Sequence, residues 1–597
     1  MYKSFLRGEE MPRPDIGAGM IHKRTSTQMV FNKIRLLMTE LLVSDIRSKM
    51  PGTKSILILW SIIAVSMFLL QASTLDVLPS LMQDEAQITD YGRLALDPLS
   101  RWSVTWWVAG DKPLLLWSYL GPVFAELGYQ IGGSSGVGPR MVALIGGFTA
   151  AVMALGWLMQ RKVPVRVAGL LSMAFLLDPL FTLSQRMARS DSWVIAFCLA
   201  ACWLLRLSES KNGFKQILLI MFSGSLAAIG LFIWPSALFL LPLILVELFH
   251  SIYNTDRINR SLKYRSWLTV YFIVAGLVTS ILLILPIQHQ IETILDDMQK
   301  MVELNVNATE TPLSRLFGLF SYQPWAKFVK AFVKTLSPFL PLLALWAVLF
   351  KRERGLLLGL ILTLILIFAT LVYEFRLLYL LPFFLALIGD LFRYPKLEQL
   401  RPKIRKLSVA FSIFTVLWSI GVSAFVRTAL AYDDGAQRKR SLINEAAKSA
   451  IGRGDYKVFL AFTYELYFAG RSLGWQLYTP YIQFSFDDEG NWIRKDDFQP
   501  KESFIKLMSE MDYAIFSESA VDDDIAKQLE ASGLYYQETI YVGNQAAEKK
   551  SMFGDSHMND IFIWYLRGAS NYGPYKLYSR VYKPLASPSM LVNKRLH

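Results

Sequence analysis

The chain has 597 residues, of which 53% are hydrophobic, and the apolar residues gather in long runs, which excludes an ordinary soluble globular protein. This composition indicates a polytopic membrane protein. The net charge of +14 does not indicate nucleic-acid binding, because residues 433–597 carry a net charge of −2 and the excess lies elsewhere, mostly between apolar runs.

The first 53 residues are basic and polar and lack the layout of a cleavable signal peptide. Between residues 30 and 41, apolar residues recur at helical spacing with charged residues among them. This pattern predicts an amphipathic helix on the cytoplasmic face of the membrane, and a helix that binds a partner protein is the alternative. We therefore expect residues 1–53 to form a cytoplasmic tail.

Eleven apolar runs, each roughly 16–22 residues long, predict about eleven transmembrane helices. The runs are 54–73, 138–158, 164–184, 191–207, 215–233, 236–250, 267–287, 330–350, 355–373, 375–392 and 407–427. Trp234-Pro235 is either a tight turn between two spans or a kink within one long helix.

Basic residues fall on alternate connections between the predicted spans. With eleven spans all six basic segments lie on one side, which the positive-inside rule identifies as the cytoplasm. Residues 54–428 are thus predicted to be a transmembrane domain with an inner N-terminus and two long outer loops, 74–137 and 288–329. The second loop either covers a site as a lid or forms a helix resting on the membrane.

From Asp433 the composition becomes that of a soluble domain. Predicted strands are Lys457–Phe462, Tyr513–Ser517 and Tyr535–Val542, and predicted helices are Ser503–Met511 and Asp523–Ser532. Their alternation predicts a small extracytoplasmic α/β domain over residues 429–597. It has no glycine-rich phosphate loop, so the sequence does not support nucleotide binding.

The stretch Leu81–Trp117 holds the first candidate functional residues. Asp84 and Glu85 follow the first apolar run at the start of a predicted helix, where negative charge is favoured. Three tryptophans suited to headgroup depth come next, followed by Lys112. Acids and a lysine at the bilayer surface suggest a site for a lipid with a phosphate head; a solvated loop with a capped helix is the alternative.

Three further charged groups fall near the predicted outer ends of spans. They are Asp111/Lys112, Arg186/Arg189/Asp191 and Glu374/Arg376. Charges near membrane depth are costly, so their positions are informative. They converge if the first four spans pack against the ninth and tenth, whereas the alternative is that Arg189 and Asp191 simply pair at a helix start.

The order of these motifs resembles the integral-membrane glycosyltransferases of the GT-C fold, and most closely the branch of protein O-mannosyltransferases and the lipid A aminoarabinose transferase. The residues that carry the resemblance are Asp84-Glu85, Lys112-Pro113-Leu114, Arg140, Ala188-Arg189-Ser190-Asp191, and Glu374-Phe375-Arg376 with Tyr379 and Pro382. The resemblance covers about residues 54–392 and the plan of an outer C-terminal domain. Leu114 stands where the family usually has a second proline, and Leu377 where it often has tyrosine.

The resemblance implies a transferase that moves a sugar from a polyprenyl-phosphate-linked donor to an acceptor hydroxyl with inversion, at the outer face of the membrane. We expect a bacterial plasma membrane, and an enzyme of the endoplasmic reticulum is the alternative. Asp84 is then the general base, and Glu85 orients the acceptor or tunes Asp84. Asp191 holds the acceptor, pairs with Arg189, or binds a divalent metal with Asp84. No metal is assigned, because related enzymes differ in metal use.

The resemblance also implies how the substrates are held. The expected ligands of the donor phosphate are Lys112, Arg189 and Arg376, and the expected substrate-binding tyrosines are Tyr91 and Tyr379. The partners are the lipid donor, a glycan, lipid or protein acceptor, and membrane lipids, with no nucleic acid.

A transporter or lipid flippase with a charged outer vestibule is the alternative function. A structural scaffold whose outer domain binds a partner is a third, and it would leave the convergent acids unexplained. Transporters usually place charges near mid-bilayer and are built from repeated halves. Here the candidate charges cluster at one face and no repeat is evident.

Overall fold

The computed structural model describes most of the chain. The described residues are 52–105, 115–253, 262–296, 322–350, 353–370, 373–393, 401–461, 463–479, 484–486, 492–494, 501–542 and 572–580. Lys112, the predicted amphipathic helix within residues 1–53 and most of the 288–329 loop lie outside them.

Each of the eleven apolar runs coincides with helix, which confirms an α-helical polytopic membrane protein. Among the described residues, eight segments are individually long and apolar enough to cross a membrane, and two bent pairs bring the number to ten. The eight are α2 (Thr53–Ala72), α5 (Val137–Gln160), α8 (Asp191–Ser208), α9 (Phe214–Ile233), η2 (Pro235–Leu240) with α10 (Leu241–Tyr253), α11 (Leu262–Ile284) with η3 (Leu285–Gln290), η5 (Glu374–Leu380) with α17 (Leu381–Phe392), and α19 (Pro402–Ile420) with η6 (Gly421–Val426) and α20 (Arg427–Arg438). Trp234-Pro235 is a turn between two of these spans.

Three of the predicted spans depart from a simple straight helix. The run 164–184 is split into α6 (Val165–Leu176) and α7 (Pro179–Gln185), which meet at 59°. The run 330–350 belongs to α14 (Tyr322–Lys334) and α15 (Phe339–Phe350), which meet at 119°. The run 355–373 gives the shorter apolar helix α16 (Arg354–Ala369).

The break between α6 and α7 and the break between α14 and α15 are joined by the side chain of Asp178. Asp178 caps α7 by accepting hydrogen bonds from the backbone N–H groups of Leu180 and Phe181, at 3.1 and 3.2 Å. Its other oxygen accepts a 2.5 Å hydrogen bond from Ser337, which lies between α14 and α15. Pro179 occupies the first turn of α7, where its missing N–H costs nothing.

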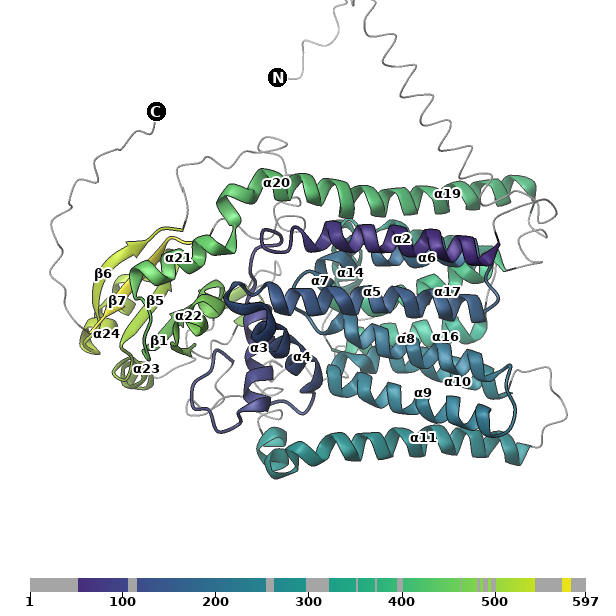
Figure 1. Ribbon diagram of the computed structural model, residues 1–597, viewed down its shortest axis with the longest axis horizontal. Coiled ribbons are helices and arrows are strands. Elements are labelled where there is room, and N and C mark those ends of the chain that lie inside the picture. The colour runs from purple at the N-terminus through teal and green to yellow at the C-terminus, as the bar shows by residue number, and fades with distance from the viewer. Residues whose placement is uncertain are drawn as a thin grey trace, which may run out of the picture.

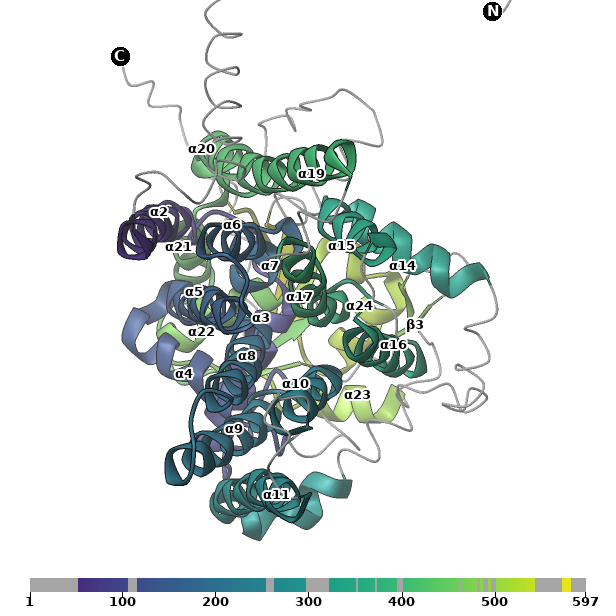
Figure 2. The same ribbon diagram turned by 90° about the vertical axis from the view of Figure 1, so that its right-hand side faces the viewer.

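The spans lie side by side with their axes nearly parallel (Figure 1), as the end-on view shows (Figure 2). In this bundle α5 packs on α8, α8 on α9, and α9 on α11. At one end of the bundle, two outer helices, α3 (Gln83–Leu96) and α4 (Leu120–Gly132), lie between the spans and the C-terminal domain (Figure 1); η1 (Gly133–Ser135) follows α4.

The C-terminal domain is built on a five-stranded mixed sheet of order β2-β1-β5-β7-β6. β1 pairs in parallel with β2 and β5, whereas β7 pairs antiparallel with β5 and β6. The elements are α21 (Arg440–Ala450), β1 (Lys457–Ala461), η7 (Tyr464–Leu466), α22 (Tyr467–Leu473), β2 (Gln476–Tyr478), β3 (Phe484–Phe486), β4 (Trp492–Arg494), α23 (Lys501–Met508), β5 (Tyr513–Ser517), η9 (Glu518–Ala520), α24 (Asp523–Ala531), β6 (Tyr535–Ile540) and β7 (Tyr575–Ser579). The predicted strands and helices of this domain are present, and the sequence analysis missed β2, β7 and the hairpin β3–β4.

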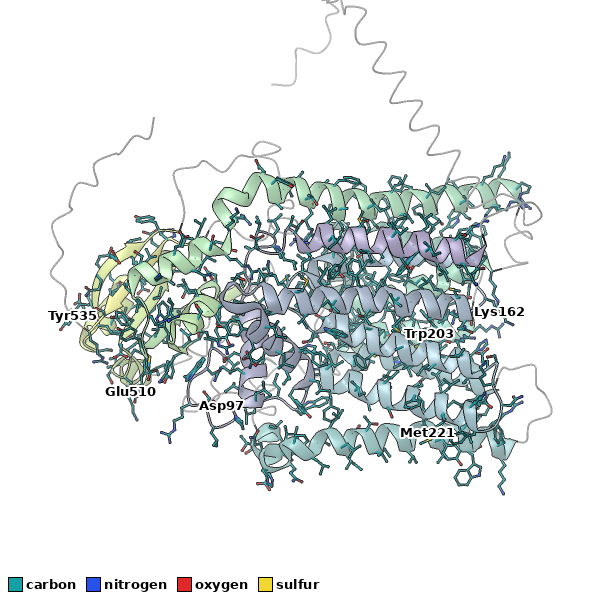
Figure 3. The ribbon with its side chains drawn as sticks, in the orientation of Figure 1. Asp97, Lys162, Trp203, Met221, Glu510 and Tyr535 are labelled. Carbon is teal, nitrogen blue, oxygen red and sulfur yellow. The ribbon has the colours of Figure 1, made fainter. Side chains whose placement is uncertain are left out.

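The molecule has two chemically distinct ends. Lys162, in a basic connection, lies at one end of the bundle, while Asp97 at the end of α3 and Glu510 of the C-terminal domain lie towards the other (Figure 3). The loop that carries the candidate acids and the C-terminal domain therefore share one end. We refer to it as the site end.

Candidate functional site

Helix α3 begins at the site end with the two adjacent acids in its first turn. The Glu85 side chain accepts a hydrogen bond from the backbone N–H of Met82 at 3.2 Å, which closes the turn as in a capping box. Successive residues of a helix are rotated by about 100°. Asp84 and Glu85 therefore face different surroundings.

Glu85 faces inward and is fully buried. Arg140 of α5 donates from Nε and Nη2 to the two oxygens of this carboxylate, both at 2.6 Å. The same guanidinium donates to the carbonyl oxygens of Leu75, Pro79 and Ser80, between 2.8 and 3.1 Å. This buried pair fixes the start of the outer loop to the bundle, and the geometry does not present Glu85 to a substrate.

Asp84 faces outward, and its side chain is 44% exposed. One of its oxygens accepts a hydrogen bond from Nη1 of Arg189, which lies just before α8. Arg189 is buried and donates from Nε to Asp191 at 2.7 Å. The two carboxylates therefore share one guanidinium. Arg189 and Asp191 do pair at the start of the helix, and the same guanidinium also brings Asp84 to them.

Asp191 is held from two sides. Its other oxygen accepts a 2.5 Å hydrogen bond from the hydroxyl of Tyr379, a fully buried residue of η5. Ser184 of α7 lies 3.4 Å from the oxygen that faces Arg189. The hydroxyl of Tyr379 is thus directed at a buried carboxylate, and its substrate-binding role stays a prediction.

The segment at the start of η5 adds Tyr373, which the sequence analysis did not single out, and gives Phe375 of the quoted motif a contact. Nη2 of Arg189 donates to the hydroxyl of Tyr373 at 3.0 Å, and its guanidinium lies 4.0 Å from the ring of Phe375. Burial raises the pKa of Tyr373, so its hydroxyl stays protonated at neutral pH. The sequence signal that could have pointed to Tyr373 is the alternation of aromatic and charged residues from Tyr373 to Arg376.

The guanidinium of Arg376 lies 5.6 Å from the centre of the Tyr373 ring and 5.8 Å from the centre of the Phe239 ring. Tyr373 therefore contacts both arginines of the site, Arg189 and Arg376. One tyrosine therefore links the guanidinium that binds Asp84 to a second guanidinium.

The remaining candidates are placed less directly. Tyr91 lies two turns after Asp84 on α3, about 10 Å along the helix axis, and is half-buried. Within the described part of the chain, no three His, Cys, Asp or Glu side chains gather into a metal site. The positive charge between Asp84 and Asp191 is supplied by Arg189.

The fold of this chain resembles that of solved structures. ArnT from Cupriavidus metallidurans, bound to undecaprenyl phosphate, matches 89% of this chain and 99% of its own with a TM-score of 0.50 and 11% identity. This chain has the GT-C fold of membrane glycosyltransferases. The predicted resemblance is thereby confirmed at the level of fold.

Other comparisons add context. The oligosaccharyltransferase of Archaeoglobus fulgidus in its apo form, also a GT-C protein, matches 83% of this chain and 75% of its own, with a TM-score of 0.49 and 12% identity. No family model matches the sequence, and no curated protein matches it in sequence.

Proposed function

We propose that this protein is a glycosyltransferase that moves a sugar from a polyprenyl-phosphate-linked donor to an acceptor hydroxyl at the outer face of a bacterial plasma membrane. The observation that carries the proposal is the partly exposed carboxylate of Asp84 paired with Arg189, which Tyr373 links to Arg376, at the site end of a GT-C fold. A base next to cations is what transfer from a lipid phosphate to a hydroxyl requires.

Asp84 is the general base in this proposal. The acceptor oxygen attacks the anomeric carbon while its proton passes to the exposed oxygen of Asp84. The bond from the anomeric carbon to the phosphate oxygen breaks, and the lipid phosphate leaves with the bonding electron pair. A single displacement of this kind inverts the configuration at the anomeric carbon.

Arg189 connects the proton transfer to the departure of the phosphate. Before the reaction its charge is divided between Asp84 and Asp191. When Asp84 takes the proton it loses its charge, so Nη1 of Arg189 loses an ionic partner just as the phosphate gains negative charge. The arginine then stabilises the leaving group more strongly than the ground state, which lowers the barrier. Arg376 supplies the second guanidinium.

The other candidates have supporting roles in this proposal. Asp191 and Tyr379 hold Arg189 in orientation, because both oxygens of Asp191 are engaged, one by Arg189 and one by Tyr379. Glu85 with Arg140 fixes the loop that carries the base. Lys112, placed by sequence alone, is the proposed third cation for the donor phosphate, and Tyr91 is proposed to face the substrate.

The test is mass spectrometry of envelope glycolipids and glycans in cells with and without the gene. We expect a missing sugar modification and an accumulated polyprenyl-phosphate sugar in the deletion strain. Wild-type protein should restore the product, and Asp84→Asn should not. Asp97→Asn is the matched control, because Asp97 is an exposed acid at the opposite end of α3. An unchanged glycan profile after deletion would refute the proposal.

A further inference from the structure

The C-terminal domain and the first outer loop share one hydrophobic core. Leu81, Ala86 and Val104 of the loop pack in the same buried cluster as Tyr464 and Tyr467 of the C-terminal domain. A hydrogen bond of 3.2 Å from the backbone N–H of Leu81 to the hydroxyl of Tyr572 adds a polar link. The domain is thus packed directly on the helix that carries Asp84.

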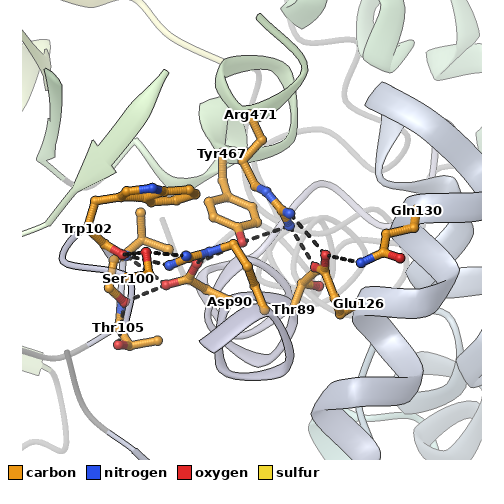
Figure 4. A network of polar contacts seen from close by, with 12 residues as sticks. Thr89, Asp90, Ser100, Trp102, Thr105, Glu126, Gln130, Tyr467 and Arg471 are labelled. Carbon is orange, nitrogen blue, oxygen red and sulfur yellow. Dashed lines mark hydrogen bonds and ion pairs between the residues drawn. The ribbon is translucent and has the colours of Figure 1, made fainter. Parts of the chain in front are cut away.

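Asp90 is the polar centre of this contact. It lies on α3, six residues after Asp84, and is fully buried. Its carboxylate accepts hydrogen bonds from Nε of Arg93 at 2.7 Å, the hydroxyl of Ser103 at 2.5 Å, the N–H of Val104 at 3.0 Å and the hydroxyl of Tyr467 at 3.0 Å. Three come from the outer loop and one from α22 of the C-terminal domain (Figure 4).

The contact continues from Tyr467 to the second outer helix. Nη1 of Arg471, also on α22, donates to the Tyr467 hydroxyl at 3.2 Å. The same guanidinium holds both oxygens of Glu126 on α4, at 2.7 and 3.0 Å (Figure 4). The two outer helices are in turn in close contact, because a Cβ at Gly92 of α3 would lie 2.0 Å from the carbonyl oxygen of Pro122 on α4.

These contacts fix both the tilt and the rotation of α3. A buried carboxylate with four donors tolerates little movement, since every lost hydrogen bond would leave a buried polar group unpaired. A helix transmits such a constraint along its axis, and six residues correspond to about 9 Å. Tyr464 of the same domain also lies near the base: burial first, and then the charge of Asp84, raises the pKa of Tyr464.

We propose that the C-terminal domain positions the general base, with Tyr467 acting through Asp90 to set the orientation of α3 and thereby the aim of Asp84. Tyr467 is a positioning residue, because it contacts neither Asp84 nor Arg189. The inference rests on the proposed function of Asp84. It assigns the C-terminal domain a part in transfer that is separate from any binding of acceptor.

The test compares two tyrosine hydroxyls of the C-terminal domain in the full-length protein. Tyr467→Phe removes the hydrogen bond to Asp90. Tyr575→Phe is the matched control, because its hydroxyl is buried in the same domain and bonds Glu465 at 2.5 Å instead of α3. Each variant is assayed for product formed per enzyme in cells, for binding of undecaprenyl phosphate by the purified protein, and for hydrogen exchange of the α3 amides.

For Tyr467→Phe we expect product formation to fall by roughly 10- to 100-fold, the effect of a small misplacement of a catalytic group. Binding of undecaprenyl phosphate should change by less than about twofold, because the cations of the site are untouched. The amides of α3 should exchange faster. Tyr575→Phe should leave both the rate and the α3 exchange near wild type. Arg471→Lys, which keeps the charge but loses the paired contact with Glu126, is the milder second variant with a loss of about 3- to 10-fold.

Wild-type rates in both Tyr467→Phe and Arg471→Lys would overturn the inference, and so would equal acceleration of α3 exchange in Tyr575→Phe. Failure of the proposed function gives a different result. In that case deletion of the gene leaves the glycans unchanged, while the exchange measurement still reports whether Tyr467 holds α3.

Discussion

Asp84 and Glu85, adjacent at the start of α3, should lose different properties when each is replaced by its amide. Glu85→Gln and Asp84→Asn each replace a carboxylate by an amide of nearly the same shape. We expect Glu85→Gln to lower stability and Asp84→Asn to lower turnover, because the structure buries one side chain against Arg140 and leaves the other partly open.

The magnitudes follow from the surroundings of each carboxylate. Glu85 is fully buried with both oxygens on Arg140, so an amide removes the balancing charge and turns an NH₂ group towards a donor. Breaking a buried ion pair from one side costs about 3–5 kcal/mol. Asp84 is 44% exposed, so its loss should cost at most about 1 kcal/mol of stability. Transfer should nevertheless fall by roughly 10²–10⁴-fold, the usual contribution of a positioned base.

Thermal unfolding of the purified proteins, followed by tryptophan fluorescence, measures the first effect, and product formation per folded enzyme measures the second. Asp97→Asn should be silent in both. A stable but inactive Glu85→Gln protein would show that Glu85 takes part in the chemistry. Near-normal turnover of Asp84→Asn would show that another group is the base, with Asp191 the next candidate.

Three further predictions concern the lipid phosphate, the topology and the pH dependence. Lys112→Gln should weaken binding of undecaprenyl phosphate while Lys112→Arg retains part of it, and a silent Lys112→Gln would leave the phosphate to the two arginines of the site. A membrane-impermeant thiol reagent added to intact cells should label Ser441→Cys and not Ser210→Cys; both serines are exposed, both native cysteines are buried, and the reverse labelling would refute the orientation. Burial raises the pKa of Glu353 from 4.5 to about 8, so between these values the folded protein holds a proton that the unfolded chain releases. The melting temperature should therefore fall as pH rises from about 5 to 8, and Glu353→Gln should flatten this dependence.

The helical bundle could be predicted because the membrane imposes a long apolar run on every span. A local signal marks one of the two breaks within the predicted spans. The run 164–184 contains Asp178 followed by Pro179, a helix cap followed by a residue suited to a first turn, and the structure breaks the helix there. Strand β2 was missed for a different reason. With three residues it is too short to show a period of its own.

The sequence picks out candidate site residues but does not display the surroundings that separate their roles. Asp84 and Glu85 look equivalent in sequence, since the partner that buries Glu85 is Arg140, 55 residues away. The contact between Asp90 and Tyr467 spans 377 residues and joins two domains. Neither residue type carries a pattern that points to a partner at such a distance. Pairings of this kind are set by tertiary packing, which a single sequence does not display.

The charges at the end opposite Asp84 separate a transferase from a transporter. Arg161 contacts Glu247 and donates to Asp390 at 2.8 Å, and Arg206 contacts the second oxygen of Glu247. These nearly fully buried groups tie α8, α10, α17 and the end of α5 together. A transporter must separate helices at this end to release its cargo, which would break these buried ion pairs. A transferase needs access at the site end and from the bilayer, so it can keep this end closed throughout its cycle. The network is therefore a rigid base against which the outer helices are positioned, which favours the transferase.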